Sequence, residues 1–245
     1  MTNSILVTGG TGRLGRALVP QLLSAGHTVR VLSRKPPSDD QICRGDLLTS
    51  EGLVEAIDGA GTIVHCATGN NRADIDGTRN LIQAAVRAGR PHLLYMSIVG
   101  VDQVDMSYYQ AKLACEQLVE RSGLPWTIQR TTQFHELIIW MCTSQRWLPV
   151  IAMPSGVSFQ PIDASEVAAR LAALADAPPA GRAPDLGGPE VRPAADLART
   201  YARSRASRRP VISVPMPGMR GYREGGHLTP EHADGRITFE QFLAA

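Results

Sequence analysis

Residues 4–15 read Ser-Ile-Leu-Val-Thr-Gly-Gly-Thr-Gly-Arg-Leu-Gly, and this stretch decides the fold. Residues 4–8 form a short apolar run of the kind that makes a fully buried strand. Glycines follow at once, and residues 14–23 have the apolar spacing of a helix that ends at Gly26. A glycine-rich turn that joins a strand to a helix is the setting in which Gly-x-Gly-x-x-Gly binds a dinucleotide pyrophosphate.

The glycines of this turn have separate expected roles. Gly9 and Gly10 allow the tight turn. Gly12 lets the backbone approach the pyrophosphate, and Gly15 lets the helix lie close to the strand. The helix N-terminus adds free N–H groups and about half a positive charge, which favours an anion. The alternative is a glycine-rich turn without a ligand. The predicted loop contacts to the cofactor are Gly9, Gly10, Thr11, Gly12, Arg13 and Leu14.

Beyond the loop, predicted strands alternate with predicted helices through residue 130. The strands are expected at 4–8, 28–33, 42–45, 62–67, 92–97 and 126–130, and the helices at 14–23, 50–57, 75–88 and 108–121. Such alternation is typical of a parallel sheet with helices on both faces. We therefore predict the α/β class, with a Rossmann doubly wound parallel sheet.

The last hundred residues are less regular. They predict a strand at 157–162, helices at 194–203 and 239–243, and a strand at 211–214. Asp163-Ala-Ser-Glu166 has the pattern of a capping box ahead of a helix with Val167, Leu171 and Leu174 in its apolar stripe. We expect one domain over 1–245, with a dinucleotide-binding core at 1–150. Residues 151–245 would form a small C-terminal α+β substrate-side extension against the carboxyl edge of the sheet.

The end of the second strand indicates which dinucleotide is bound. An NAD site needs a carboxylate there for the ribose diol, whereas an NADP site needs cations for the 2′-phosphate. The sequence offers Ser33-Arg34-Lys35 and no acid, and Arg34 can bind a phosphate with two hydrogen bonds. These features predict NADP(H), with contacts from Ser33 and Arg34. In the competing interpretation these charges are merely solvated, or Asp39 or Asp40 binds NAD instead.

Asp46 and Leu47 follow the third predicted strand. A short acid at the carboxyl end of a strand can accept a hydrogen bond from the adenine amino group. A turn or helix-capping role explains the same residue equally well, so both interpretations stay open.

Tyr108 and Lys112 lie four residues apart on a predicted helix and therefore on one face of it. Tyrosine has an ordinary pKa near 10, and a nearby ammonium favours the phenolate and can also hold the nicotinamide ribose. Ser97 ends the preceding strand, where its hydroxyl could steady a substrate oxygen. We predict Ser97, Tyr108 and Lys112 as the catalytic group. The alternative is an aromatic pair, Tyr108 with Tyr109, beside a surface lysine.

Composition limits the function classes. The 245 residues include 25 basic and 23 acidic ones, a net charge of +2 that gives no reason to expect nucleic-acid or membrane partners. The four cysteines show no paired spacing, which predicts reduced thiols in a cytoplasmic protein. The N-terminal residues lack a signal-peptide pattern, and no apolar run approaches the roughly 18 residues of a membrane span. The histidines show no metal-ligand spacing, so no metal is predicted.

At this point the chain resembles the atypical short-chain dehydrogenase/reductases of the NmrA-like NAD(P)H-binding type. The resemblance runs over nearly the whole chain. It rests on stretches such as LVTGGTGRLG at 6–15, IVHCA at 63–67, YMSIVGVD at 95–102 and FQPIDASEVAARL at 159–171. It implies further cofactor contacts from Asp46, Leu47 and Ala67, with Asp46 at the adenine. It also implies that the loop at 131–135 shapes a substrate pocket, with candidates Gln133, Phe134 and His135.

The function expected from this resemblance is an NADPH-dependent oxidoreductase that reduces a small carbonyl or quinone-like compound. The alternative is a non-catalytic NADP(H) sensor that binds a protein partner, as in relatives that lack the tyrosine. A sugar-nucleotide epimerase or dehydratase is a third possibility, against which the short C-terminal part counts. For His135, a structural role is preferred over a role as a catalytic acid or base. No oligomeric state is predicted.

Overall fold

The computed structural model describes residues 3–36, 41–69 and 71–245, and the chain divides into two compact units. Unit 1 comprises Met1–Ser97, Met106–Arg130 and Val167–Pro184, and unit 2 comprises Ile98–Asp105, Thr131–Glu166 and Asp185–Ala245. This grouping differs from the expected division at residue 150, because the chain passes between the units five times.

Unit 1 is built on a seven-stranded sheet with the order β3-β2-β1-β4-β5-β6-β9. β1 is central and runs parallel to both neighbours, so that Val7 lies opposite Val31 on one side and Val64 on the other. The order of the first six strands is that of a doubly wound nucleotide-binding sheet, which confirms the predicted Rossmann fold. The strands are β1 Ser4–Thr8, β2 Thr28–Ser33, β3 Ile42–Arg44, β4 Thr62–His65, β5 His92–Ile98, β6 Trp126–Thr131 and β9 Gly181–Arg182.

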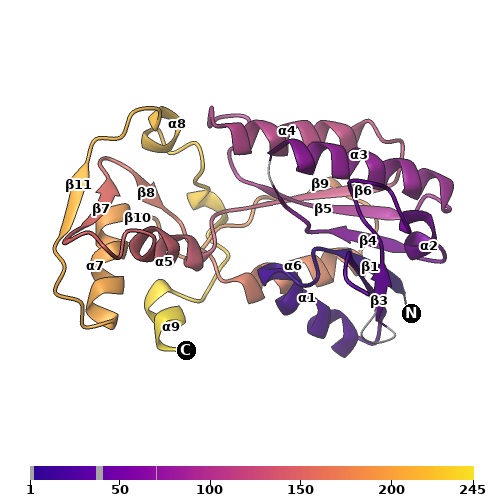
Figure 1. The fold of residues 1–245 in the computed structure, drawn as a ribbon, viewed down its shortest axis with the longest axis horizontal. Coiled ribbons are helices and arrows are strands. Elements are labelled where there is room, and N and C mark those ends of the chain that lie inside the picture. The colour runs from indigo at the N-terminus through magenta and orange to yellow at the C-terminus, as the bar shows by residue number, and fades with distance from the viewer. Residues whose placement is uncertain (1–2, 37–40, 70) are drawn as a thin grey trace. The chain divides into compact units, whose positions relative to one another are not determined.

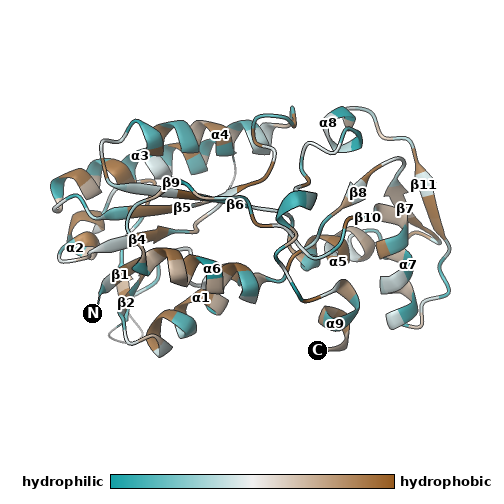
Figure 2. Cartoon of the chain, turned by 180° about the vertical axis from the view of Figure 1, so that it is seen from behind, coloured by the Kyte–Doolittle hydropathy of each residue, from teal (hydrophilic) through white to brown (hydrophobic). Residues whose placement is uncertain are grey.

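Helices cover both faces of this sheet (Figure 1). On one face lie α2 (Leu53–Ile57), α3 (Asn71–Arg87) and α4 (Ser107–Glu120), and on the other lie α1 (Arg13–Ser24) and α6 (Ala164–Asp176). Leu6, Ile63 and Leu93 of the strands are fully buried in one core cluster with Leu53 and Leu81 of the helices. Figure 2 shows that the covering helices carry both hydrophobic and hydrophilic residues, as expected for helices with one buried side.

The predicted helices and strands of unit 1 are confirmed, with ends that shift by a few residues. The predicted helix at 50–57 is shorter, because Ser50 and Gly52 have φ values of 64° and 68°. Residues in this left-handed region cannot continue a right-handed helix, so α2 begins at Leu53.

Unit 2 has its own core. Ile138, Met153, Phe159, Leu197 and Phe239 are buried together there. Two small sheets contribute to it: β7 (Ile151–Pro154) runs parallel to β11 (Val211–Val214), and β8 (Ser158–Phe159) pairs antiparallel with β10 (Arg192–Pro193). Its helical segments are α5 His135–Thr143, α7 Ala194–Ser204, α8 Arg220–Arg223, α9 Phe239–Ala244 and the 3₁₀ turn η1 Pro230–His232.

Two sequence predictions in unit 2 hold only in part. The predicted strand at 157–162 forms only at Ser158–Phe159, because its later residues turn to another segment: the Ile162 amide donates to the Gln133 carbonyl at 2.8 Å, and Ile162 forms a parallel bridge with Phe134. Asp163 caps its helix as predicted, but the reciprocal contribution of Glu166 to a capping box is absent among the described residues. Asp163 accepts from the Ser165 amide at 2.8 Å, whereas the Glu166 carboxylate accepts from the backbone amide of Arg236 at 2.6 Å.

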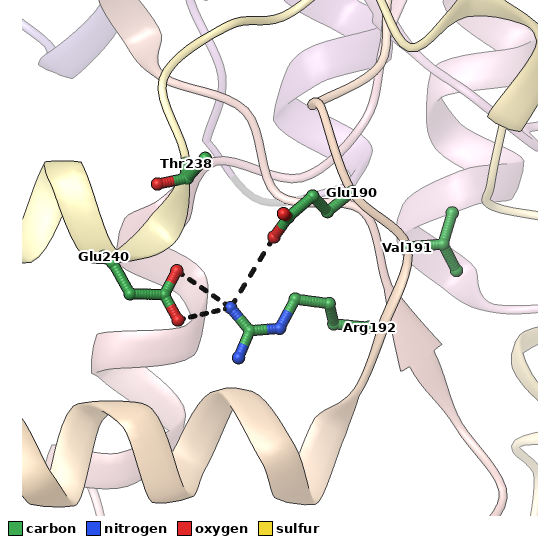
Figure 3. Close-up of a pocket in the computed structure, with 5 residues that line it drawn as sticks. All are labelled: Glu190, Val191, Arg192, Thr238 and Glu240. Atoms are coloured by element: carbon green, nitrogen blue, oxygen red, sulfur yellow. Dashed lines mark hydrogen bonds and ion pairs between the residues drawn. The ribbon is translucent and has the colours of Figure 1, made fainter.

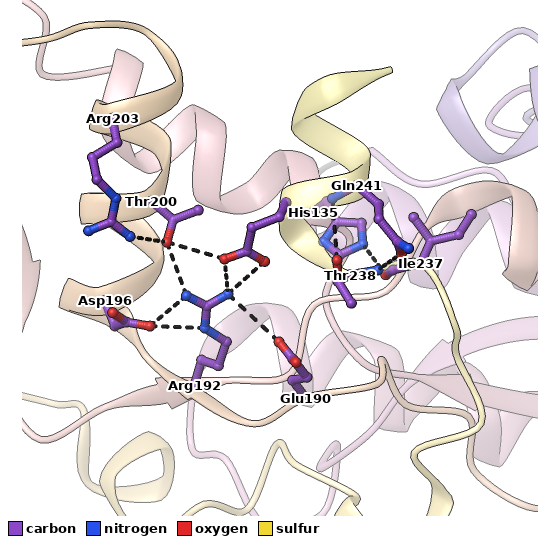
Figure 4. Close-up of polar contacts among 10 residues, drawn as sticks. His135, Glu190, Arg192, Asp196, Thr200, Arg203, Ile237, Thr238 and Gln241 are labelled. Carbon is purple, nitrogen blue, oxygen red and sulfur yellow. Dashed lines mark hydrogen bonds and ion pairs between the residues drawn. The ribbon is translucent and has the colours of Figure 1, made fainter.

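Arg192 ties three elements of unit 2 together (Figure 4). Its guanidinium donates to Asp196 of α7 at 2.6 Å and to Glu240 of α9 at 2.7 Å, and lies 3.7 Å from Glu190. A depression lined by Glu190, Val191, Arg192, Thr238 and Glu240 surrounds this cluster (Figure 3). The cation that lines the depression is Arg192, and carboxylates already neutralise its charge. The depression therefore marks the place where ion pairs hold the C-terminal helix α9 against α7.

The ion pair of Glu240 predicts a pH dependence of stability. Partial burial acts in the opposite direction, but the hydrogen bonds and charge of Arg192 lower the pKa of Glu240 below its ordinary 4.5. A lowered carboxyl pKa stabilises the folded state above the unfolded pKa, and this contribution is lost as the pH falls through the folded pKa.

We therefore expect Glu240→Gln to reduce the free energy of unfolding at pH 7 by about 0.5 kcal/mol, because the Glu240 carboxylate is half exposed. The difference from the wild type should disappear below the lowered pKa, as measured by urea unfolding at several pH values. Glu224→Gln is the control, since its pair with Arg220 is more exposed. A difference that does not shrink as the pH is lowered would contradict the expectation.

Candidate cofactor site

The glycine loop between β1 and α1 is packed too tightly for side chains. Gly9 has a φ of +71°, and a Cβ added there would lie 2.6 Å from the Ala67 nitrogen. A Cβ on Gly10 would meet Val31 at 2.6 Å, and one on Gly15 would meet the Gly10 Cα at 2.3 Å. The close approach of Gly15 is to the loop itself. The sequence predicted that Gly15 lets the helix lie close to the strand, whereas in the structure this glycine lets the helix begin directly against the turn.

The first turn of α1 is left open to an anion. Gly12 is the N-cap residue and offers no side-chain acceptor, and the first turn contains no acid. The Gly12 amide donates to the Gly9 carbonyl at 2.9 Å, and the first helical bond runs from the Arg16 amide to the Gly12 carbonyl. The amides of Leu14 and Gly15 precede that bond and have no acceptor within the helix. These amides and the glycine loop before them fit a pyrophosphate. The assignment of Gly9 through Leu14 as cofactor contacts stays a prediction.

The end of β2 presents a cation beside this loop. Arg34 is exposed and makes no ion pair within the described ranges. Ser33 ends β2, and its hydroxyl accepts from the Lys35 amide at 3.1 Å. The competing residues Asp39 and Asp40 lie outside the described residues. The arrangement fits a 2′-phosphate, which needs an accessible guanidinium at this strand end.

Asp46 takes part in a turn. Its Oδ1 accepts from the Leu48 amide at 2.7 Å, and its own amide donates to the Glu51 carbonyl at 3.0 Å. The carbonyl of Leu47 accepts from the Asn80 side chain at 2.8 Å. The turn role left open by the sequence is therefore present, and the adenine contact of Asp46 stays a prediction.

Ser97 and Lys112 are buried in unit 1 with unused hydrogen-bonding capacity. Ser97 is 0% exposed, and its Oγ has no hydrogen-bond partner among the described residues. Lys112 is 5% exposed, and its Nζ donates to the Met96 carbonyl at 3.3 Å and lies 5.1 Å from the centre of the Tyr95 ring. Within the described part of unit 1 this ammonium has no carboxylate partner. A buried cation with so few partners fits a polar ligand.

Tyr108 is placed differently from the other two members of the predicted group. It lies near the start of α4, is 37% exposed and packs edge-on against Tyr109 at 6.1 Å. The structure records no hydrogen bond from its hydroxyl to Ser97 or Lys112 in the described ranges. Unit 1 therefore contains all three residues, and their joint catalytic role stays a prediction.

Sequence reasoning missed a buried histidine beneath this site. His65 ends β4, with its Nδ1 2.6 Å from the Thr8 hydroxyl and its Nε2 3.1 Å from the Thr78 hydroxyl. Burial, followed by the charge of Lys112, lowers the pKa of His65 to about 3, so its ring is neutral at physiological pH. The parallel register places Thr8 opposite His65. The sequence signal for this residue was a histidine inside an apolar strand, whereas its alignment with Thr8 is set only when the strands pair.

The neighbouring thiol of Cys66 is protonated at physiological pH. Burial raises the pKa of Cys66 to about 12, against a smaller opposing effect of Lys112. All four cysteines are free thiols. This agrees with a packing role for Cys66 and gives no nucleophile at the site.

The three pocket candidates lie in unit 2, where each has a structural contact. Gln133 donates to the His227 carbonyl at 3.1 Å, and Phe134 forms an isolated bridge with Ile162. His135 is fully buried, and its Nε2 lies 3.0 Å from the Ile237 carbonyl (Figure 4). Its ring stacks on that of Phe242, with the ring centres 4.8 Å apart. His135 begins α5, whereas the sequence predicted a loop there. Its substrate role stays a prediction.

No cluster of His, Cys, Asp or Glu in the described residues has the geometry of a metal centre. The helices of the described ranges are all too short or too polar to cross a bilayer.

The sequence is similar to those of known proteins. The profile of a family described as NAD(P)H-binding matches residues 9–137. The (4-alkanoyl-5-oxo-2,5-dihydrofuran-3-yl)methyl phosphate reductase of Streptomyces griseus is 30% identical over 202 residues, which cover 76% of this chain and 68% of the reductase. Photosystem II assembly factor Ycf39 of Trieres chinensis is 28% identical over 56% of this chain. The match spans about half of that relative (47%), and 14% of an uncharacterized protein of Mycobacterium bovis.

Solved structures resemble the whole chain. NADPH-dependent quinone oxidoreductase QOR2 of Escherichia coli, complexed with NADPH, has a TM-score of 0.83 at 16% identity over 98% of each chain. A nucleoside-diphosphate-sugar epimerase of Staphylococcus aureus has a TM-score of 0.81 at 18% identity over 100% of each chain. At such identities the likeness is one of fold, and the same fold hosts different chemistries.

Proposed function

Because this chain belongs to the NAD(P)H-binding family, we propose that it is an NADPH-dependent oxidoreductase that reduces a small carbonyl or quinone-like compound. The observation that carries the proposal is the buried ammonium of Lys112, which has a backbone carbonyl and an aromatic face as its neighbours. Such a charge is costly to bury unless a polar ligand completes its shell. Lys112 lies in the same unit as the glycine loop between β1 and α1, so the ligand that fits its ammonium is a nicotinamide ribose.

The choice of NADPH over NADH rests on Arg34. An exposed guanidinium at the end of β2 can bind a 2′-phosphate through two parallel hydrogen bonds. The fold neighbour from Escherichia coli was solved with NADPH, which supports the same choice.

In the proposed reaction, three residues of this chain would have separate roles. The bound dinucleotide supplies the hydride, and Lys112 orients its ribose. Ser97 donates a hydrogen bond from its unpartnered hydroxyl to the substrate oxygen. Tyr108 delivers a proton to that oxygen, assisted by the positive charge of Lys112, which favours the phenolate that is left behind. A quinone would accept the hydride without needing the tyrosine.

Tyr108→Phe separates these two substrate classes. We expect carbonyl reduction to fall by about 10²–10⁴-fold, the usual contribution of a positioned proton donor, while quinone reduction persists. The measurement is NADPH oxidation against a panel of carbonyls and quinones. Tyr109→Phe is the matched control, because it removes a neighbouring phenol that has no assigned role. Undiminished carbonyl reduction in Tyr108→Phe would remove the tyrosine from the mechanism.

A second candidate function is a non-catalytic NADP(H) sensor that binds a protein partner. The exposure of Tyr108, without a hydrogen bond to Ser97 or Lys112 in the described ranges, favours it. It predicts tight NADPH binding without turnover on the panel, and a partner whose affinity changes with the redox state of the cofactor. Partner capture that is indifferent to the cofactor would count against it.

A further inference from the structure

A buried ion pair lies one helical turn from Lys112. Glu116 is on α4, is 2% exposed and is bound by Arg130 of β6, which is 4% exposed. Both carboxylate oxygens are used: Oε1 accepts from Nε at 2.8 Å and Oε2 from Nη2 at 2.6 Å. This is the parallel two-bond geometry that a guanidinium makes best.

Lys112 and Glu116 would otherwise be natural partners. Residues four apart on a helix lie on one face with their Cβ atoms about 5–6 Å apart, and opposite charges at this spacing attract. In this structure they turn to different strands. Lys112 reaches the Met96 carbonyl of β5, and Glu116 reaches Arg130 of the adjacent β6. The charges are thus held apart in a buried setting where an unpaired carboxylate would be costly.

We propose that Arg130 is a positioning residue that keeps the Glu116 carboxylate away from Lys112, so that the ammonium stays available to the cofactor. The inference rests on the proposed function, since it assigns Lys112 to the dinucleotide. Without Arg130, the buried Glu116 carboxylate lacks its cation, and the cation next to it on the same helix face is Lys112. The new pair would occupy the ammonium and compete with the cofactor.

The test uses the two reciprocal variants of the pair in the full chain. Arg130→Met frees the carboxylate, and we expect the Kd for NADPH, measured by calorimetry, to rise about tenfold or more. Glu116→Gln breaks the same ion pair but releases no anion, so its Kd should stay within about twofold of the wild type. Arg130→Met/Glu116→Gln removes both charges and should restore binding. Thermal unfolding of each variant checks that the protein is folded at the assay temperature.

A purely structural role for the pair gives a different result. Both single variants lose a buried ion pair and would then weaken NADPH binding alike, which would overturn the inference. An unchanged Kd in Arg130→Met would also overturn it. If Arg130→Met does not fold, Arg130→Leu replaces it, because it also removes the cation and leaves no donor that could hold the Glu116 carboxylate near β6.

Failure of the inference and failure of the proposed function are distinguishable. A wild-type protein that binds no NADPH removes the proposed function itself. A wild type that binds NADPH, with reciprocal variants that bind equally well, removes only the role of Arg130.

Discussion

Gly9→Ala is expected to raise the Kd for NADPH by about 100-fold or more, which corresponds to about 3 kcal/mol of binding free energy. The new Cβ would lie 2.6 Å from the Ala67 nitrogen, on a residue with a φ of +71°. The loop would have to move away from β4, and its amides would no longer converge on one anion. The measurement is calorimetric titration with NADPH.

Gly26→Ala provides the control for this substitution. Gly26 also has a positive φ, of +87°, but a Cβ there would meet nothing within 4 Å. It should therefore cost about 1 kcal/mol of stability through backbone strain and leave NADPH binding intact. Equal loss of binding in both variants would show that general destabilisation is responsible. Normal binding by Gly9→Ala would mean that the loop does not grip the pyrophosphate.

Arg34→Asp is expected to reverse the cofactor preference. The substitution removes the guanidinium from the end of β2 and places a carboxylate there, which repels a 2′-phosphate and suits a ribose diol. A charge-assisted hydrogen bond contributes about 1.5–3 kcal/mol, so the Kd for NADPH should rise about 10–100-fold. The Kd for NADH should stay the same or fall. The measurement is a pair of titrations with NADPH and NADH on each protein.

Arg87→Asp is the matched control for the change in net charge. Arg87 is exposed at the last turn of α3, which runs back from the carboxyl end of the sheet, so it lies away from the strand ends that face the cofactor. The Arg87→Asp substitution should leave the Kd for NADPH and the Kd for NADH unchanged. Unaltered NADPH affinity in Arg34→Asp would remove the basis for the choice of NADP(H).

Much of the candidate site followed from local sequence. The apolar run at β1, the glycines and the periodic residues of α1 are adjacent in the chain, and strand and helix periodicity are properties of short segments. For the same reason Arg34 and the pair of Tyr108 and Lys112 could be assigned to the ends of particular elements. Their neighbours across the sheet could not, because residues 65 and 8, or 116 and 130, meet only after the strands have paired.

The sequence by itself determined the order of strands and helices in unit 1, and with it the parallel sheet and the glycine turn at its centre. Only the tertiary structure decided which polar partner each buried side chain takes. Glu166 binds distant backbone amides instead of capping its own helix, and Glu116 binds Arg130 instead of Lys112. A local pattern offers several partners of similar energy, and the choice among them is made by packing, which brings one of them close and removes water from the rest.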